Sequence, residues 1–175
     1  MGEVLIVTGP PGAGKSSVAA LVVAHFEPAA LVPGDEFFAF LERGAIAPWL
    51  REAHAQNEVV TRAAAACTGA LAAGDLTVVY DGVVGPWFLP VFAAAAAVPT
   101  LHYAVLLPPV EECLARVATR QGHGFTDQEA ARRMHAEFAN ADLATRHVVD
   151  SREAPDDVVR TLLGRMSEGA LLHQQ

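Results

Sequence analysis

The sequence predicts an α/β fold in three layers, in which helices cover both faces of a five-stranded parallel sheet. Two observations lead to this prediction. Short apolar runs of strand length alternate with helical stretches along all 175 residues, a pattern typical of parallel strands joined by helices. Hydrophobic residues make up 52% of the chain and charged residues 18%, which indicates one globular domain with a sizeable core over residues 1–175.

The first strand and the first helix flank a glycine-rich loop. Val4–Val7 is a short apolar run, and residues 17–26 place apolar side chains at helical spacing. Between them, Gly9–Ser16 reads Gly-Pro-Pro-Gly-Ala-Gly-Lys-Ser, which is a complete phosphate-binding loop pattern. The alternative is a chance match in a glycine-rich turn, and the flanking strand and helix argue against it.

Each part of this loop has a chemical reason. The glycines let backbone N–H groups curl around phosphate oxygens, and the helix N-terminus adds its positive end. We expect Lys15, the only lysine of the chain, to reach the β- and γ-phosphates of ATP. We expect the Ser16 hydroxyl to ligate Mg²⁺. The loop residues predicted to bind the nucleotide are Gly9, Pro10, Pro11, Gly12, Ala13, Gly14, Lys15, Ser16 and Ser17.

The next elements lead to a long helix. Residues 30–33 form a second predicted strand, and a helix is predicted over residues 36–43. Residues 45–52 form a looser link. A long helix is then predicted from His54 to Ala73, ended by Gly74.

The second half continues the alternation. A third strand is predicted over residues 76–80, a short aromatic-rich helix around residues 87–92, and a fourth strand over residues 102–107. A helix over residues 110–121 is followed by the break Gly122-His123-Gly124.

The last elements complete the sheet. Thr126 is predicted to cap a helix that runs to about Leu143, and residues 147–149 form a fifth strand. Pro155 begins the last helix, and the tail after Gly169 is expected to fray.

Two aspartates follow predicted strands at the edge where ligands of parallel sheets bind. Asp81 ends the third strand and is predicted to hold Mg²⁺, directly or through water. Asp35 follows the second strand, where its carboxylate is suited to accept a proton from an acceptor hydroxyl; Glu36 is a weaker candidate for this base. The alternative for each aspartate is a helix cap or a turn.

Four arginines form a second candidate group. Arg116 and Arg120 are four residues apart and share a helix face, while Arg132 and Arg133 lie on the next predicted helix. A lid over about residues 120–137 would bring guanidinium groups against the transferring phosphate and exclude water. The alternative is a solvated helix face with ion pairs, and whether Arg132 or Arg133 joins the chemistry stays open.

This pattern resembles the small P-loop kinases of the shikimate kinase, gluconate kinase and adenylate kinase group. Gly34-Asp35 looks like the Gly-Asp of gluconate kinases, and the run from Glu112 to His123 resembles their lid entry. The resemblance implies a P-loop NTPase fold with strand order 2-3-1-4-5. It also implies that Arg116 lies against the adenine, that Arg120 contacts phosphates, and that residues 148–155 form the adenine-side loop.

The acceptor side departs from the gluconate kinases. Glu36-Phe37-Phe38 replaces their His-Pro-containing segment, and the loop after Asp81 is apolar and aromatic, including Trp87. The link before the long helix carries three more candidate acceptor residues: Trp49, Arg51 and His54. An aromatic pocket suits an acceptor that is larger or less charged than a sugar acid. Antibiotic phosphotransferases of the chloramphenicol phosphotransferase type share this core, and core packing of these aromatics is the alternative.

The sequence therefore predicts a cytoplasmic ATP- and Mg²⁺-dependent kinase that phosphorylates a hydroxyl group of a small molecule. A nucleotide or nucleoside kinase is one alternative, for which only Arg51 and Arg62 are clear candidates to hold an acceptor phosphate. A regulatory nucleotide-binding module is another.

The net charge of −8 without a basic run argues against a nucleic-acid or membrane partner. Cys67 and Cys113 are expected to be reduced core thiols, and the protein to be a monomer or homodimer.

Overall fold

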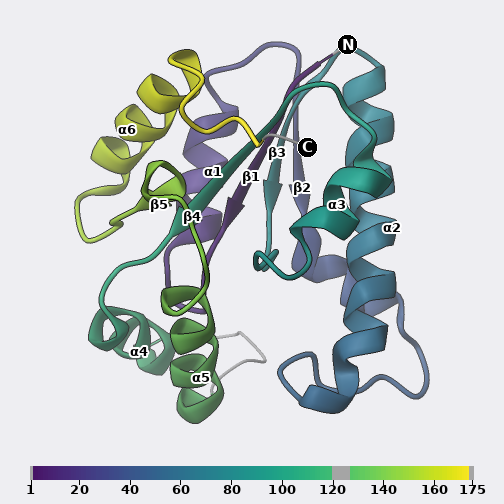
Figure 1. Ribbon diagram of the computed structural model, residues 1–175, viewed down its shortest axis with the longest axis vertical. Coiled ribbons are helices and arrows are strands. Elements are labelled where there is room, and N and C mark those ends of the chain that lie inside the picture. Colours follow the sequence, from purple (N-terminus) through teal and green to yellow (C-terminus); the bar gives the residue numbers. More distant parts are fainter. Residues whose placement is uncertain (1, 120–126, 174–175) are drawn as a thin grey trace.

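The computed structural model describes residues 2–119 and 127–173, which form a parallel sheet between two layers of helices (Figure 1). The strand order β2-β3-β1-β4-β5 and the α/β/α layers confirm the predicted fold class. The strands are β1 (Val4–Thr8), β2 (Ala29–Pro33), β3 (Thr77–Asp81), β4 (Leu101–Leu106) and β5 (Val148–Val149). All their pairings are parallel, so the carboxyl ends of the strands meet at one edge of the sheet.

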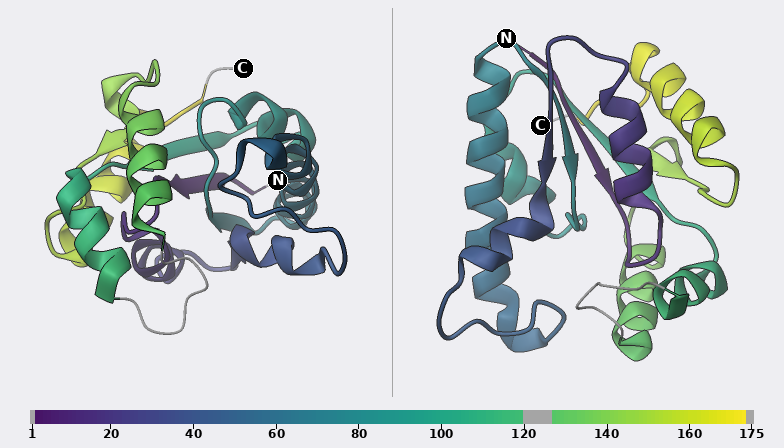
Figure 2. Two further views of the ribbon diagram at one scale, coloured as in Figure 1. Left: turned by 90° about the horizontal axis from the view of Figure 1, so that it is seen from below. Right: turned by 180° about the vertical axis from the view of Figure 1, so that it is seen from behind.

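The helices divide between the two faces of the sheet and this edge (Figures 1 and 2). The α-helices are α1 (Lys15–Val23), α2 (His54–Ala73), α3 (Leu89–Ala96), α4 (Val110–Thr119), α5 (Gln128–Ala139) and α6 (Pro155–Ser167). The 3-10 helices are η1 (Gly34–Phe40), η2 (Arg51–Ala53) and η3 (Thr145–His147). Helices α1 and α6 cover one face, α2 and α3 cover the other, and α4 and α5 lie beyond the carboxyl ends of the strands.

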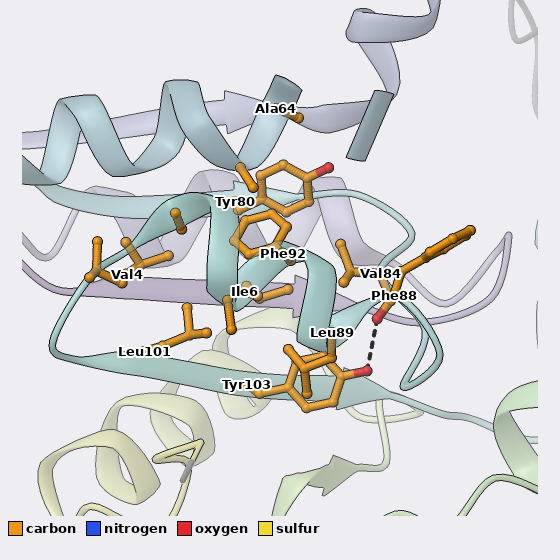
Figure 3. Packing of buried hydrophobic residues seen from close by; sticks show 14 of the residues in the cluster. Val4, Ile6, Ala64, Tyr80, Val84, Phe88, Leu89, Phe92, Leu101 and Tyr103 are labelled. Carbon is orange, nitrogen blue, oxygen red and sulfur yellow. Dashed lines mark hydrogen bonds between the residues drawn. The ribbon is translucent and has the colours of Figure 1, made fainter. Parts of the chain in front are cut away.

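The central strand β1 explains the two cores, because successive side chains of a strand point to opposite faces. Val4 and Ile6 pack with the residues of α2 and α3, as Figure 3 shows. Leu5 and Val7 pack with α1 and α6. All four side chains are fully buried, so the strand that leads into the phosphate-binding loop is held rigidly from both faces.

Three predicted helix boundaries are wrong. The helix expected over residues 36–43 is the 3-10 helix η1, which ends at Phe40. Helix α5 ends at Ala139 instead of Leu143, and its N-cap is Asp127 instead of Thr126. The Asp127 carboxylate accepts a hydrogen bond from the Ala130 amide at 2.9 Å, so the cap lies one residue later. Thr126 and the Gly122–Gly124 break lie outside the described residues, as does the predicted end of the helix that is described as α4.

The tail after Gly169 does not fray within the described residues, contrary to the prediction. Leu171 is fully buried, and its carbonyl oxygen accepts a hydrogen bond from the Tyr103 amide at 2.9 Å. The His173 amide donates to the Leu101 carbonyl at 2.8 Å. The reason is that β5 pairs with only the last residues of β4, so the tail satisfies backbone groups on the rest of that edge.

The two cysteines differ in their exposure to solvent. Cys113 is fully buried, as predicted, whereas Cys67 is exposed on α2, so its assignment to the core is wrong.

In the part of the chain that the structure describes, no helix is long and apolar enough to cross a membrane.

Candidate active site

The phosphate-binding loop has a backbone that only glycine accommodates well. It connects β1 to α1, and Gly9, Gly12 and Gly14 have φ angles of 145°, 81° and 92°. A Cβ atom on Gly12 would also overlap with the carbonyl oxygen of Cys113. The glycines therefore provide both the unusual dihedral angles and the close approach of the backbone to α4.

Lys15 and Ser16 are the first residues of α1, where backbone N–H groups lack partners within the helix. The Lys15 side chain is 8% exposed, and its ammonium group donates a hydrogen bond to the Pro10 carbonyl at 3.2 Å. The ammonium group is thus folded back over its own loop. Ser16 is exposed, and both residues line the same cavity. This combination of a helix N-terminus, a cation and a hydroxyl suits a polyphosphate.

Arg116 on α4 holds the phosphate-binding loop through hydrogen bonds to backbone carbonyl groups. Its guanidinium group donates to the carbonyl oxygens of Gly12 at 3.3 Å and Ser151 at 3.1 Å. The Ser151 hydroxyl donates to the Ala13 carbonyl at 2.7 Å. Arg116 therefore connects the phosphate-binding loop to the segment that follows β5, and its Glu112 partner lies 4.0 Å away. Arg120, predicted one turn later, lies outside the described residues.

Asp35 and Asp81 lie at the same edge of the sheet as the loop. Asp81 ends β3, between its register partners Val7 on β1 and Pro33 on β2, and Asp35 follows Pro33 by two residues. Burial raises the pKa of the Tyr80 phenol, and the nearby carboxylates of Asp35 and Asp81 raise it further. Tyr80 therefore stays a neutral hydroxyl group beside the two acids.

Gly34 makes this arrangement possible. A Cβ atom on Gly34 would overlap with the Tyr80 hydroxyl group, which is held in the core by the edge-on contact of its ring with Phe92. In the sequence, Gly34 stands out only by its resemblance to the Gly-Asp of gluconate kinases. The structure supplies a physical reason, because the residue before Asp35 needs to leave room for a buried tyrosine.

A cavity of about 810 Å³ brings most of the predicted site residues together. It extends from Gly12, Gly14, Lys15 and Ser16 to Asp35 and on to the predicted acceptor side. All four candidate acceptor residues line it: Trp49, Arg51, His54 and Trp87. Arg133 also lines the cavity, whereas Arg132 and Asp81 do not. Arg62 lies outside it and pairs with Glu58 at 2.6 Å.

The loop between β3 and α3 is fixed relative to the phosphate-binding loop. The Val84 amide donates a hydrogen bond to the Thr8 hydroxyl at 2.8 Å. Thr8 is the residue directly before Gly9, so this bond joins the two loops. The Tyr103 hydroxyl donates to the Val84 carbonyl, also at 2.8 Å (Figure 3). One residue later, Gly85 leaves room for the ring of Trp87. The start of the loop that carries Trp87 is therefore fixed by hydrogen bonds to β1 and β4.

Several residues that line the cavity were not singled out from the sequence, among them Asn57, Thr61, Met134 and Glu137. Asn57 and Thr61 follow His54 by three and seven residues, which places them on one face of α2. That spacing was a signal in the sequence. Met134 and Glu137 gave no such signal, because only the packing of α5 brings them to the cavity.

Helix α5 contacts both tryptophan segments. The Arg133 guanidinium donates to the Trp49 carbonyl at 3.1 Å, and the rings of Phe138 and Trp87 are 5.3 Å apart. The His54 ring stacks on Phe88, with a distance of 5.1 Å between ring centres. The aromatic walls of the cavity are thus held by neighbouring elements on several sides.

Among residues 2–119 and 127–173, no group of three or more His, Cys, Asp or Glu side chains could hold a metal ion. A protein-only metal cage is therefore absent from the described part of the chain. A Mg²⁺ ion that arrives with a nucleotide needs only one or two protein oxygens, since phosphates and water complete its shell. The Ser16 hydroxyl and the Asp81 carboxylate provide oxygens of the required kind.

Residues 4–141 match the model of a protein family described as AAA domain. The chain belongs to this family. A search of curated proteins finds no match. Among solved structures, the chain is similar to a sugar kinase from Janibacter sp., with a TM-score of 0.73 and 20% identity over 99% of this chain and 100% of that one.

Two further structures have the same fold. A gluconokinase from Sinorhizobium meliloti has a TM-score of 0.69 and 18% identity over 97% of this chain and 93% of that one. An APS kinase from Mycobacterium tuberculosis, in complex with AMPPNP and APS, has a TM-score of 0.71 and 16% identity over 95% of this chain and 98% of that one. At these identities the likeness shows the fold. It confirms the resemblance to small P-loop kinases.

Proposed function

We propose that this protein is an ATP- and Mg²⁺-dependent phosphotransferase that moves the γ-phosphoryl group of ATP to a hydroxyl group of a small molecule. The observation that carries the proposal is a single cavity lined by both Lys15 and Asp35. A cation for the transferred phosphate and a carboxylate for the acceptor proton thereby face the same space. The kinase-like fold and the kinases among the similar structures support this assignment.

The residues take distinct roles in this proposal. The backbone N–H groups of the phosphate-binding loop and the Lys15 ammonium hold the β- and γ-phosphates. Ser16 and Asp81 would hold Mg²⁺, which neutralises phosphate oxygens when bound. Asp35 accepts the proton of the attacking hydroxyl group. Arg120 stabilises the charge of the transferring group, and Arg116 positions the loop and the adenine side.

The other nucleotide-based functions have less support. A kinase for nucleotides needs cations around the acceptor phosphate, and Arg62 is engaged by Glu58 outside the cavity. A regulatory module has no need for a carboxylate such as Asp35 in the phosphate cavity.

The test is a screen of hydroxyl compounds with purified protein, ATP and Mg²⁺, in which ADP release and the mass of the product are measured. We expect one class of compound to accelerate ADP release and to gain the mass of one phosphoryl group. ADP release that no compound accelerates, together with nucleotide-dependent capture of a protein partner, would favour the regulatory module.

A further inference from the structure

The cavity reaches far beyond the phosphate-binding loop. Its volume of about 810 Å³ is toward the upper end of the range of about 300–1,000 Å³ typical of small-molecule sites. Arg116 and Ser151, on the proposed adenine side, do not line it. The cavity therefore accommodates the phosphates and the acceptor, and it leaves more room than a small sugar acid fills.

The charges of the acceptor side cancel. Besides Lys15, the charged side chains among the described lining residues are two cations, Arg51 and Arg133, and two anions, Asp35 and Glu137. Arg133 already donates to the Trp49 carbonyl. An acceptor that carries a carboxylate, sulfate or phosphate needs an excess of cations to offset its loss of hydration. Apart from Lys15, which the proposed function assigns to the phosphates of ATP, the described lining residues provide no such excess.

Aromatic rings form the walls. Four aromatic side chains line the cavity and come from three separate segments: Phe38 from η1, Trp49 from the link before η2, and the neighbours Trp87 and Phe88 from the loop between β3 and α3. Trp87 remains 39% exposed although its ring packs against Phe138. Val84, three residues before Trp87, is hydrogen-bonded through both its amide and its carbonyl, and the Trp87 ring packs against Phe138, so the loop and the ring both have partners within the protein itself. Fixed aromatic surface of this kind binds flat rings with little loss of conformational entropy.

We infer that the acceptor is a neutral alcohol that carries an aromatic or similarly flat ring, held against Trp87 and Trp49 while its hydroxyl group reaches Asp35. This inference rests on the proposed function and narrows its substrate class. It excludes anionic polyols such as sugar acids as the preferred acceptors.

The chain offers a direct binding signal, because its only two tryptophans both line the cavity. Intrinsic tryptophan fluorescence is measured while the purified protein is titrated with aryl-substituted diols and nucleosides, and separately with gluconate and other anionic polyols. We expect saturable quenching by at least one neutral ring-bearing alcohol and none by the anionic polyols. Single-tryptophan variants Trp49→Phe and Trp87→Phe then assign the signal to one wall.

A steady-state comparison tests the role of the ring. For the neutral alcohol with the largest quenching, Trp87→Leu should raise the acceptor KM about 10-fold or more, because aromatic stacking and apolar contact are lost. The KM for ATP should change by less than about twofold, since the Trp87 ring, which packs against Phe138 of α5, is assigned to the acceptor and not to the nucleotide. The matched control is Phe40→Leu, because Phe40 is an aromatic residue of η1 that is 76% exposed and outside the cavity lining.

The outcomes separate the inference from the proposed function. Phosphorylation of an anionic polyol, with neither quenching nor product from any ring-bearing alcohol, would overturn the inference and leave the proposed function standing. Saturable quenching by a ring-bearing alcohol, without phosphorylated product from any compound, would overturn the proposed function. A ring-bearing alcohol that both quenches and is phosphorylated supports the two together.

Discussion

At the scale of single residues, Lys15 is the simplest test of the nucleotide site. Lys15→Ala removes the one lysine charge that faces the cavity, so we expect phosphotransfer to fall about 10²- to 10³-fold, as for the loss of one preorganised charge-stabilising group. Folding should be affected little, because the hydrogen bond from Lys15 to the Pro10 carbonyl contributes less than about 2 kcal/mol and the substituted side chain lines a cavity and not the hydrophobic core. Turnover and thermal unfolding are measured together, and near-normal turnover would contradict the assignment of the loop.

Arg120 tests stabilisation of the transition state. The role of Arg120 is predicted from the sequence alone, and the test is therefore a comparison of reaction rate with ATP affinity. Arg120→Ala should lower kcat much more than it weakens ATP binding, because its charge acts on the transferring group; arginines of this kind contribute on the order of 10³-fold or more. The control is Arg132→Ala, since Arg132 is exposed and does not line the cavity. An unchanged kcat for Arg120→Ala would make Arg120 a surface charge.

At the scale of elements, helix packing outweighs local propensity at Gly69. Alanine is favoured over glycine inside a helix by about 1 kcal/mol, yet a Cβ atom on Gly69 of α2 would overlap with the backbone carbonyl of Ala96 at the end of α3. We expect Gly69→Ala to destabilise the protein by about 1–3 kcal/mol through overpacking. In denaturant unfolding, the control Gly164→Ala on α6 should stabilise it, because nothing lies within 4 Å of that Cβ position. Equal stabilisation by both substitutions would contradict the packing of α2 against α3.

The elements also show what the sequence could and could not predict. The glycine-rich loop and α2 have local signals, namely the glycine and lysine spacing and the stop at Gly74, and the place of the loop between a strand and a helix and the bounds of α2 were predicted correctly. The predicted order of strands came from the resemblance, because pairing between strands is not a local property. The contact between Arg133 and Trp49 joins residues 84 positions apart, so no local pattern could reveal that α5 completes the cavity. The α-helix predicted over residues 36–43 was wrong because Phe37 packs against the core and Phe38 lines the cavity. These tertiary contacts override the local helical propensity.

At the scale of the whole molecule, buried histidines make stability depend on pH. Burial lowers the pKa of His102 and His147 below the ordinary value of 6.5. As the pH falls through 6.5, the unfolded chain therefore binds protons that the folded chain does not. We expect the free energy of unfolding to decrease from pH 7.5 toward pH 5, measured by denaturant titration at each pH.

The matched substitutions are His147→Asn and His25→Asn. The Asn side chain can still donate to the Tyr103 carbonyl, as the His147 ring does at 2.9 Å, but it does not titrate. His147→Asn should reduce the dependence on pH, and His25→Asn is the control because it replaces an exposed histidine. A slope that stays unchanged in His147→Asn would show that this histidine is not the source of the effect.

If γ-phosphoryl transfer and proton removal occur in one cavity, the fate of a labelled γ-phosphate should depend on the Asp35 carboxylate, which the Asp35→Asn variant removes. Asn keeps the shape and any capping oxygen but cannot accept the proton. We expect the wild-type protein to move the label to the hydroxyl compound, and Asp35→Asn to bind ATP–Mg²⁺ nearly unchanged while single-turnover transfer falls by roughly 10²- to 10⁴-fold. A joint loss of metal affinity, ATP affinity and rate would instead make Asp35 a metal anchor. Transfer at the wild-type rate would contradict the proposed mechanism.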